Sequence, residues 1–254
     1  MTWSIGLHDR GVVVTGAAGG IGSAIAAQFA SAGARVCAVD LDRDAIDAVI
    51  AGIEAPERHL AVAADLRDLD GHDPMLARAL GSFGRFDVLA HAAAVLRRRD
   101  SVDEVTEDDW DFQIDVNLKA TFFLNRGAAR LMREQGRGGR IVNFASQGWW
   151  TGGLDGSVVY AASKGGIVSM SRGLARSWAR DGITVNTVSP GAADTPMMRG
   201  GLTDEALDTF VSTIPLGRMA EPDEVASAVI FLASDHARYI TGATINVSGG
   251  QLMY

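Results

Sequence analysis

Short apolar runs rich in β-branched residues alternate with longer amphipathic stretches along the whole chain, and this alternation limits the folds open to it. The expected strands lie at residues 12–15, 35–39, 59–63, 86–90, 140–144, 183–188 and 243–247. The expected helices lie between them, near residues 20–32, 42–53, 73–82, 107–135, 157–180 and 222–233. Strands that are apolar on both faces and separated by helices form a parallel sheet covered on both sides. The pattern therefore predicts an α/β fold with a doubly wound parallel sheet and helices on both faces.

Length and composition fit a single globular unit. A chain of 254 residues, 47% of them hydrophobic, buries a sizeable core without disulfides or metals. No repeat, low-complexity segment or linker divides the sequence, so we expect one domain over residues 1–254. The formal net charge of −8 argues against a nucleic-acid partner or an anionic membrane surface. A single cysteine, Cys37, excludes an internal disulfide, and no secretory signal or membrane-spanning run is apparent, which together favour a cytoplasmic protein.

A glycine-rich turn follows the first expected strand. It runs from Thr15 to Gly22 and contains Gly16, Gly20 and Gly22 directly before an expected helix. Glycines there allow a tight turn and a close approach to a pyrophosphate, and the helix N-terminus offers N–H groups to the anion. The spacing is G-x-x-x-G-x-G, and such a turn alone fits a connection without a ligand equally well.

An acidic residue at the end of the second expected strand indicates the cofactor. Asp40 lies where a carboxylate binds the ribose 2′-hydroxyl of NAD and repels the 2′-phosphate of NADP. Ala17 and Ala18 supply no basic side chain for that phosphate, and the neighbouring Arg43 is flanked by aspartates. The third expected strand leads to Asp65, at the edge of the sheet where an adenine would lie. The sequence thus favours NAD.

A serine, a tyrosine and a lysine suggest proton chemistry. Ser146 follows the expected strand 140–144, while Tyr160 and Lys164 are spaced i and i+4 and so share one helix face. A lysine ammonium, together with an oxidised nicotinamide, would lower the pKa of the phenol from its ordinary value near ~10. Tyr160 is then a candidate acid/base and Ser146 a hydrogen-bond donor to the same substrate oxygen. By themselves, Tyr160 and Lys164 fit two half-exposed helix residues as well.

Taken together, these features resemble the classical short-chain dehydrogenase/reductase family over nearly the whole chain. The matching residues are Thr15–Gly22, Asp40, Asp65, Val116-Asn117-Leu118, Ser146, Tyr160–Lys164, Ser189-Pro190-Gly191, Thr195-Pro196-Met197, and the tail from Thr241-Gly242 to Gly249-Gly250. The resemblance implies a Rossmann-type sheet of about seven strands, an NAD(P) cofactor and a small-molecule substrate. It also implies a homotetramer in which the helices at 107–135 and 157–180 pack against their copies.

The resemblance also implies roles for individual residues. Asn117 would maintain a kink and a water-mediated proton relay to Lys164, Ser146 would polarise the carbonyl, Tyr160 would be the acid/base, and Lys164 would also bind the nicotinamide ribose. The implied cofactor-binding residues are Gly16, Gly20, Ile21, Gly22, Asp40, Leu41, Asp65, Leu66, Ala92, Tyr160, Lys164, Pro190, Gly191 and Thr195. No metal site is expected, because no His/Cys/Asp cluster has ligand spacing.

One motif departs from the family pattern. After the fourth expected strand the chain has His91-Ala92-Ala93-Ala94, where the family usually shows Asn-Asn-Ala-Gly. The family's asparagine ties the central strands together, so either His91 supplies equivalent hydrogen bonds or the loop lies differently. Because a lone histidine at a strand end is more often structural than a ligand, we expect a structural role.

Three segments bear on the substrate and on assembly. Trp149 and Trp150, just after Ser146, suit stacking on a sugar ring or lining an apolar pocket, but equally core or interface packing. The stretch 189–216 is expected to be an irregular lid carrying the apolar residues Met197, Met198, Leu202 and Phe210. Residues 243–247 are the expected edge strand, and the apolar tail 252–254 is expected to pack near a subunit interface and to close a neighbouring site.

Three functions remain open. The first is an NAD(H)-dependent oxidoreductase interconverting a secondary alcohol and a ketone, with a small hydroxy compound, sugar or polyol favoured. The second is a 3-oxoacyl-thioester (acyl-carrier-protein) reductase, for which the run Arg97–Arg99 and Arg137 are possible docking residues. The acids at 103–109 offset that run, and Asp181 stands where such reductases commonly carry an arginine. The third is a non-catalytic NAD-binding regulator, against which the four intact catalytic positions argue.

Overall fold

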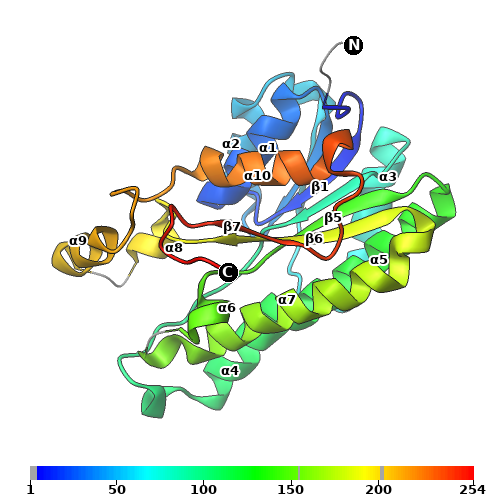
Figure 1. The fold of residues 1–254 in the computed structure, drawn as a ribbon. Coiled ribbons are helices and arrows are strands. Elements are labelled where there is room, and N and C mark those ends of the chain that lie inside the picture. Colours follow the sequence, from blue (N-terminus) through cyan, green and yellow to red (C-terminus); the bar gives the residue numbers. More distant parts are fainter. Residues whose placement is uncertain (1–4, 154, 201–202) are drawn as a thin grey trace.

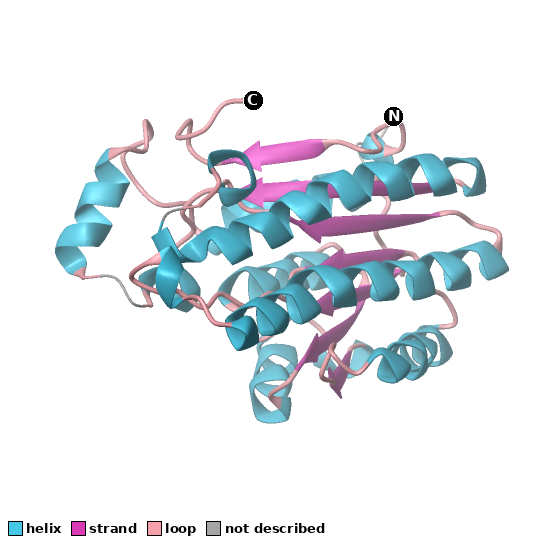
Figure 2. Cartoon of the chain, turned by 90° about the horizontal axis from the view of Figure 1, so that it is seen from below, coloured by secondary structure: helices cyan, strands magenta, loops and turns pink. Residues whose placement is uncertain are grey.

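The fold is a seven-stranded parallel sheet between two layers of helices, seen in a computed structural model that describes residues 5–153, 155–200 and 203–254 (Figures 1 and 2). The strand order is β3-β2-β1-β4-β5-β6-β7. The strands are β1 (Gly11–Thr15), β2 (Arg35–Asp40), β3 (Leu60–Ala63), β4 (Val88–His91), β5 (Gly139–Phe144), β6 (Ile183–Pro190) and β7 (Thr244–Val247). The predicted fold class is confirmed, and β7 forms the expected edge.

The helices cover both faces of the sheet. They are α1 (Gly20–Ser31), α2 (Arg43–Gly52), α3 (His72–Phe83), α4 (Glu107–Ile114), α5 (Ala120–Gln135), α6 (Gly148–Thr151), α7 (Val158–Trp178), α8 (Pro196–Arg199), α9 (Asp204–Ser212) and α10 (Pro222–Ala233). Short 3₁₀ turns lie at Pro56–Arg58, Leu69–Gly71, Val102–Glu104, Asp155–Ser157, Ala179–Asp181 and Asp235–Ala237. None of the described helices is long and apolar enough to cross a membrane.

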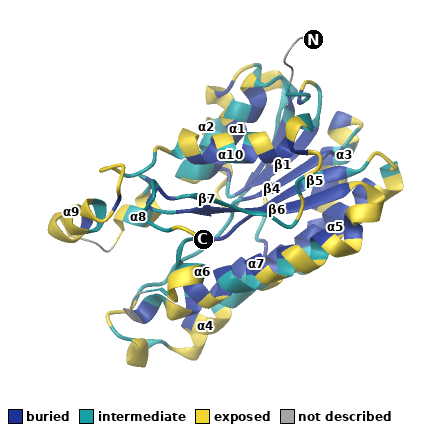
Figure 3. Cartoon of the chain, viewed as in Figure 1, coloured by how far each residue is buried: buried dark blue, intermediate teal, exposed yellow. Residues whose placement is uncertain are grey.

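Two apolar cores lie between the sheet and its helices. In β1, Val12 and Val14 point into the core beneath α1 and α10, while Val13 points into the core beneath α3 and α5. This is the two-residue period of a strand buried on both faces. Figure 3 shows the resulting buried centre, with exposed residues on the outer sides of the helices. The sheet is therefore a rigid platform whose strand ends can position a site.

Two expected elements differ from the structure. The helix predicted over 107–135 is interrupted by a π-helical turn at Asp115–Lys119, between α4 and α5. The stretch 189–216 was expected to be irregular, but it contains the end of β6 together with α8 and α9. Both short helices start at a threonine whose hydroxyl accepts a backbone N–H, Thr195 before α8 and Thr203 before α9. These caps are the start signals that the sequence reading missed. Leu202, one of the apolar residues placed on the lid, lies outside the described residues.

Candidate active site

The predicted site residues gather at the carboxyl ends of the strands. Each of the first six strands ends at, or leads directly into, one of them, in the order Gly16, Asp40, Asp65, Ala92, Ser146 and Pro190. Because neighbouring parallel strands end at the same edge, the topology brings these distant positions together. The two central strands, β1 and β4, place the glycine loop beside Ala92 at the middle of this edge.

The glycine loop is shaped to admit an anion. A Cβ on Gly16, whose φ is +70°, would lie 2.7 Å from the Ala93 nitrogen, and one on Gly22 would lie 1.9 Å from the Gly16 oxygen. No described side chain caps α1, and its first turn holds no acidic residue, so the N–H groups of Gly20, Ile21 and Gly22 face the loop unopposed. A Cβ on Gly20 would meet the Thr195 methyl at 2.8 Å, which places Thr195 directly against this helix start. The loop fits the pyrophosphate of a dinucleotide.

Asp40 is fixed beside that loop. Its Oδ2 accepts the Ala18 N–H at 3.0 Å and its Oδ1 accepts the Leu41 N–H at 2.8 Å. The carboxylate thus stands at the end of β2, next to Leu41, whose side chain is 66% exposed. No basic side chain contacts Asp40 within the described residues, so its negative charge stays available to a ribose.

The third strand provides a second carboxylate. Asp65 is bound by Arg67, with Nη2 and Oδ2 2.6 Å apart, and this hydrogen bond lowers the pKa of Asp65. Leu66 packs its side chain into the core beneath α3, so only its main chain can face a ligand. The predicted contact from Leu66 is therefore restricted to backbone atoms.

Tyr160 and Lys164 project from α7 as the helix spacing predicts. Lys164 Nζ lies 5.4 Å from the Tyr160 ring centroid and donates a hydrogen bond to the Phe144 oxygen at 3.0 Å. Burial lowers the pKa of Lys164 to about 7. Burial also raises the pKa of Tyr160 to about 12, although its hydrogen bond to Ser146 acts in the opposite direction. Without a bound nicotinamide, the pKa of Tyr160 is therefore raised, whereas the lowered pKa expected from the sequence includes the charge of the oxidised nicotinamide.

Asn117 lies in the π turn between α4 and α5, the place where the family resemblance implies a kink. Its side chain is fully buried, accepts the Val95 N–H at 2.8 Å and donates to the Val95 oxygen at 2.9 Å. It also donates to Ser163 Oγ at 3.2 Å, and Ser163 in turn donates to the Tyr160 carbonyl at 2.7 Å. Asn117 therefore connects the kink to the helix turn that carries Tyr160.

The end of β6 completes the edge. The Pro190 oxygen accepts the Gln147 N–H at 3.0 Å, and the Gly191 N–H is donated to Val247 on β7. A Cβ on Gly191 would lie 2.9 Å from Ser248, so only glycine fits. Gln147 is not among the residues that the sequence predicts for the site, although it follows Ser146. Its Oε1 is buried and has no hydrogen-bond partner among the described residues, which marks it as a candidate contact for a ligand.

The C-terminal tail packs on its own chain beside α6 (Figure 1). The Tyr254 ring centroid lies 5.0 Å from that of Trp149 and 5.6 Å from that of Trp150, and the Trp149 Nε1–H donates to the Tyr254 hydroxyl at 3.3 Å. Trp150 and Tyr254 remain 56% and 44% exposed. We call these three rings the aromatic cluster. Two of them, Trp149 and Trp150, follow Ser146 by three and four residues.

Two of the three arginines in the run Arg97–Arg99 are paired with acids of the segment 103–109, as expected. Arg97 and Arg99 both form ion pairs with Asp109, at 3.3 and 2.8 Å, and these contacts lower the pKa of the aspartate. Arg98 instead donates to the carbonyl oxygens of Met197 and Gly200. The run therefore fastens its loop to α4 and α8.

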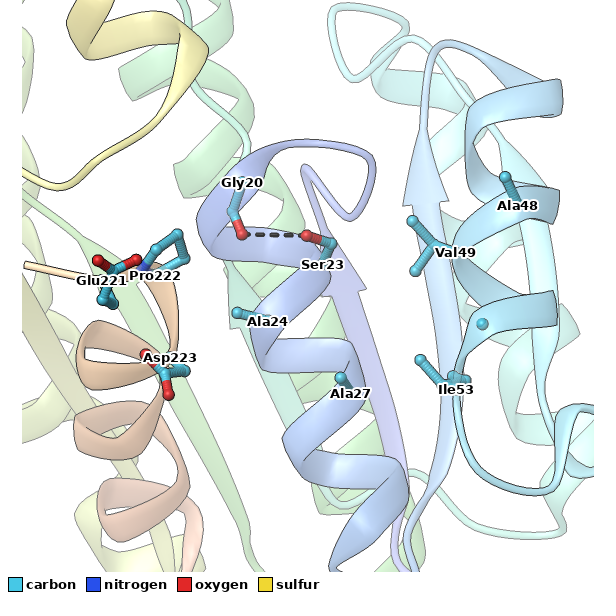
Figure 4. Close-up of a pocket in the computed structure, with 11 residues that line it drawn as sticks. Gly20, Ser23, Ala24, Ala27, Ala48, Val49, Ile53, Glu221, Pro222 and Asp223 are labelled. Atoms are coloured by element: carbon cyan, nitrogen blue, oxygen red, sulfur yellow. Dashed lines mark hydrogen bonds between the residues drawn. The ribbon is translucent and has the colours of Figure 1, made fainter.

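A surface groove near the glycine loop is not the catalytic site (Figure 4). It lies between α1, α2 and the start of α10 and is lined mainly by small apolar residues. None of the proposed catalytic residues lines it. Among the described residues, no group of three or more histidine, cysteine, aspartate or glutamate side chains could hold a metal ion.

Comparison with known proteins gives a family. A family model described as enoyl-(acyl carrier protein) reductase matches residues 16–251. D-Threitol dehydrogenase of Mycolicibacterium smegmatis is 39% identical, over 96% of this chain and 93% of that protein. The 3-oxoacyl-(acyl-carrier-protein) reductase FabG of Thermotoga maritima is 37% identical, over 96% and 98% respectively. A crystal structure of a short-chain dehydrogenase/reductase (glucose/ribitol dehydrogenase) from Brucella melitensis has a TM-score of 0.91 at 35% identity, covering 99% of this chain and 100% of that one.

The fold and these matches define an oxidoreductase that acts on CH–OH groups with a nucleotide cofactor, NAD or NADP. The chain belongs to the classical short-chain dehydrogenase/reductase family, as the sequence motifs predicted. Its reaction interconverts a secondary alcohol and a ketone.

Proposed function

We propose that the protein is an NAD(H)-dependent dehydrogenase of a small secondary alcohol, with sugars and polyols as the favoured substrates. One observation carries the proposal: the glycine loop, Asp40 and the Ser146–Tyr160–Lys164 group share one edge of the sheet. Hydride transfer needs a bound nicotinamide and an acid/base at the same substrate carbon and oxygen. At this edge, the glycine loop and Asp40 would hold the cofactor, and Tyr160 would be the acid/base.

The cofactor would be held largely by backbone atoms and by two carboxylates. The N–H groups of the glycine loop suit the pyrophosphate, and Asp40 suits the adenosine ribose. The residues that we assign to the cofactor are Gly16, Gly20, Ile21, Gly22, Asp40, Leu41, Asp65, Leu66 through its main chain, Ala92, Tyr160, Lys164, Pro190, Gly191 and Thr195. When bound, the nicotinamide supplies or accepts the hydride.

Four side chains would transfer the proton of the substrate oxygen or support that transfer. Ser146 holds the substrate oxygen by a hydrogen bond, and Tyr160 gives that oxygen a proton in reduction or takes one in oxidation. A phenol with a pKa of about 12 is almost wholly protonated at neutral pH, so positive charge beside it is needed to lower that pKa and populate the phenolate. Lys164 provides that charge when protonated, and Asn117, linked through Ser163 to the Tyr160 turn, holds the relay geometry. These four residues are the proposed catalytic set.

The substrate class rests on two supports. Relatives at 35–39% identity include a threitol dehydrogenase and a structure described as glucose/ribitol dehydrogenase. The aromatic cluster includes the two tryptophans that follow Ser146 by three and four residues, and aromatic faces pack well against the C–H faces of sugars. A panel of polyols and sugars with NAD or NADP, followed by the absorbance of the reduced nicotinamide, tests the proposal. No turnover with any secondary alcohol would overturn it.

The second candidate function is reduction of a 3-oxoacyl thioester. The identity to the Thermotoga maritima reductase favours it. Two observations argue against it. Arg97 and Arg99 form ion pairs with Asp109. At the position where such reductases commonly carry an arginine, this chain has Asp181, which lies 3.8 Å from Arg133. Acetoacetyl thioester with NADH or NADPH is the discriminating substrate in the same panel.

We also propose a cytoplasmic homotetramer of single-domain chains. A shallow apolar groove on α5 and α7 is lined by residues that include Leu118, Phe122, Phe123, Gly166 and Met170. Phe122 remains 39% exposed and Trp110 on α4 remains 50% exposed. Apolar surface of this kind suits a symmetric contact between copies. The single cysteine, which is buried, supports a reducing compartment.

Removal of residues 251–254 should impair substrate use or assembly more than cofactor binding. Tyr254 of the tail contacts Trp149 and Trp150, and Gln251 donates a hydrogen bond to Thr213, the residue that follows α9. No tail residue contacts the glycine loop among the described residues. We expect a KM several-fold higher, or a smaller mass by light scattering, with NADH affinity changed by less than about twofold. A truncated protein with unchanged mass and KM would contradict this role.

The segment of α8 and α9 should become protected when the site is filled. Leu207 is the buried residue of α9, and Figure 1 shows this helix projecting from the body of the molecule. Segments with few buried contacts open readily, and such segments often close over substrate. Hydrogen exchange in Asp204–Ser212 is therefore expected to slow with NAD and substrate together. Identical exchange in the free and ternary states would make α9 an ordinary surface helix.

A further inference from the structure

His91 occupies a central buried position between the cofactor loop and the catalytic kink. It is the last residue of β4, is 2% exposed, and pairs in register with Thr15 of β1 and Asn143 of β5. Its Nδ1 lies 2.6 Å from the Thr15 hydroxyl, and its Nε2 lies 2.8 Å from the Thr121 hydroxyl on α5. One imidazole thus joins two strands and a helix.

The hydrogen-bond partners fix which ring nitrogen carries the proton. The Thr121 hydroxyl donates its single hydrogen to the main-chain oxygen of Asn117, so it can only accept from His91. Nε2 is therefore protonated, and Nδ1 accepts from the Thr15 hydroxyl. That hydroxyl in turn accepts the Ala93 N–H at 3.4 Å. Each donor in the chain from Ala93 to Asn117 meets an acceptor.

His91 stays neutral. Burial lowers its pKa to about 3, and the nearby Lys164 and His72 act in the same direction. A group that does not titrate near neutral pH cannot be a proton donor or acceptor in the reaction at that pH. Any contribution of His91 is then geometric.

The two ends of this chain lie at functional positions. At one end, Thr15 is the first residue of the glycine loop, and the space for a Gly16 side chain is closed by Ala93. At the other, the Asn117 carbonyl belongs to the π turn, whose widened ring leaves backbone groups without their usual helical partners. The Thr121 hydroxyl engages that carbonyl.

We propose that His91 is a positioning residue for the reaction: through Thr121 it sets the Asn117 turn relative to the glycine loop. The inference rests on the proposed function, because it acts through the proposed catalytic residue Asn117. It assigns His91 more than the sheet-joining role expected from the sequence, which the bond to Thr15 alone would satisfy. The bond to Thr121 reaches beyond the sheet to α5.

The test compares variants that break each link. His91→Asn shortens the bridge, so that it can reach Thr15 or Thr121 but not both, and Thr121→Val removes the hydroxyl at equal volume. We expect each to lower kcat about fivefold with KM and NADH affinity within about twofold, as misplacement of a catalytic group does. The double variant should lose no more than either single one, because both break the same chain.

Two further variants separate positioning from general loss of stability. Thr121→Ser restores a hydroxyl and should recover most of kcat. Thr187 lies one strand beyond Asn143 in the same row, and its buried hydroxyl has no partner among the described residues, so Thr187→Val should leave kcat unchanged. If His91→Asn does not fold, the Thr121→Val and Thr121→Ser pair decides. Wild-type kcat in Thr121→Val, additive losses in the double variant, or failure of Thr121→Ser to recover kcat would overturn the proposal. Full activity of Tyr160→Phe would instead overturn the proposed function.

Discussion

Tyr160→Phe should reduce turnover by roughly 100-fold or more while NADH still binds. The substitution removes the phenolic O–H and keeps the ring, so the packing beside Lys164 Nζ, 5.4 Å from the ring centroid, is retained. Loss of a general acid/base typically costs 10²–10⁴-fold in rate. The substrate oxygen would keep its hydrogen bond from Ser146 but would have no group positioned to exchange its proton. Steady-state kinetics with the best alcohol of the panel, together with NADH titration by tryptophan fluorescence, measures both effects.

Tyr239→Phe is the matched control for this experiment. Tyr239 is fully exposed, so the same loss of a hydroxyl there should leave kcat unchanged. If Tyr160→Phe retained turnover within a few-fold of the unmodified protein, another group would carry the proton. The regulator hypothesis makes a different prediction. A non-catalytic protein would show no turnover before or after either substitution.

The sequence was sufficient for the sheet and for most of the site because both depend on strand ends. Strands buried on both faces give continuous apolar runs, and the residue after each run must lie at the same edge of a parallel sheet. Asp40, Asp65 and Ser146 could be placed in this way without knowing any contact. The hydrogen bond of Asp40 to Ala18 in the glycine loop could not, because it depends on how the loop bends back over β2.

The features that the sequence did not give depend on tertiary packing. The π turn at Asp115–Lys119 inserts one residue into an otherwise regular amphipathic pattern, so periodicity alone predicts a continuous helix. The raised pKa of Tyr160 reflects burial, which spacing does not report. The sequence leaves open whether His91 replaces the hydrogen bonds of the family's asparagine or whether the loop lies differently. In the structure, His91 hydrogen-bonds to Thr15 of the neighbouring strand. Its second bond, to Thr121, could not be anticipated, because nothing in the sequence relates those two positions.

Replacement of Asp40 should change the preference for NAD over NADP more than it changes any other property of the enzyme. In the unmodified protein, NAD is expected to be preferred over NADP by at least tenfold in kcat/KM, about 1.4 kcal/mol of discrimination. The reason is charge: the carboxylate is held at the end of β2 by the N–H groups of Ala18 and Leu41, where a 2′-phosphate would have to lie. Asp40→Ala combined with Leu41→Arg removes that charge and adds an opposite one, so the preference should fall to parity or reverse.

Because Asp40 also accepts a hydrogen bond from the glycine loop, the effect of its charge must be separated from its effect on the loop. Asp40→Asn removes the charge but keeps an oxygen that can accept the Ala18 N–H, so it should weaken the preference for NAD with little change in NAD affinity. Asp44→Ala removes an equal charge from the exposed first turn of α2, where no ribose is expected, and should leave the preference intact. Equal kcat/KM for NAD and NADP in the unmodified protein would refute the assignment. A loss of preference in Asp44→Ala as large as in Asp40→Asn would show that net charge around the site, and not the position of Asp40, selects the cofactor.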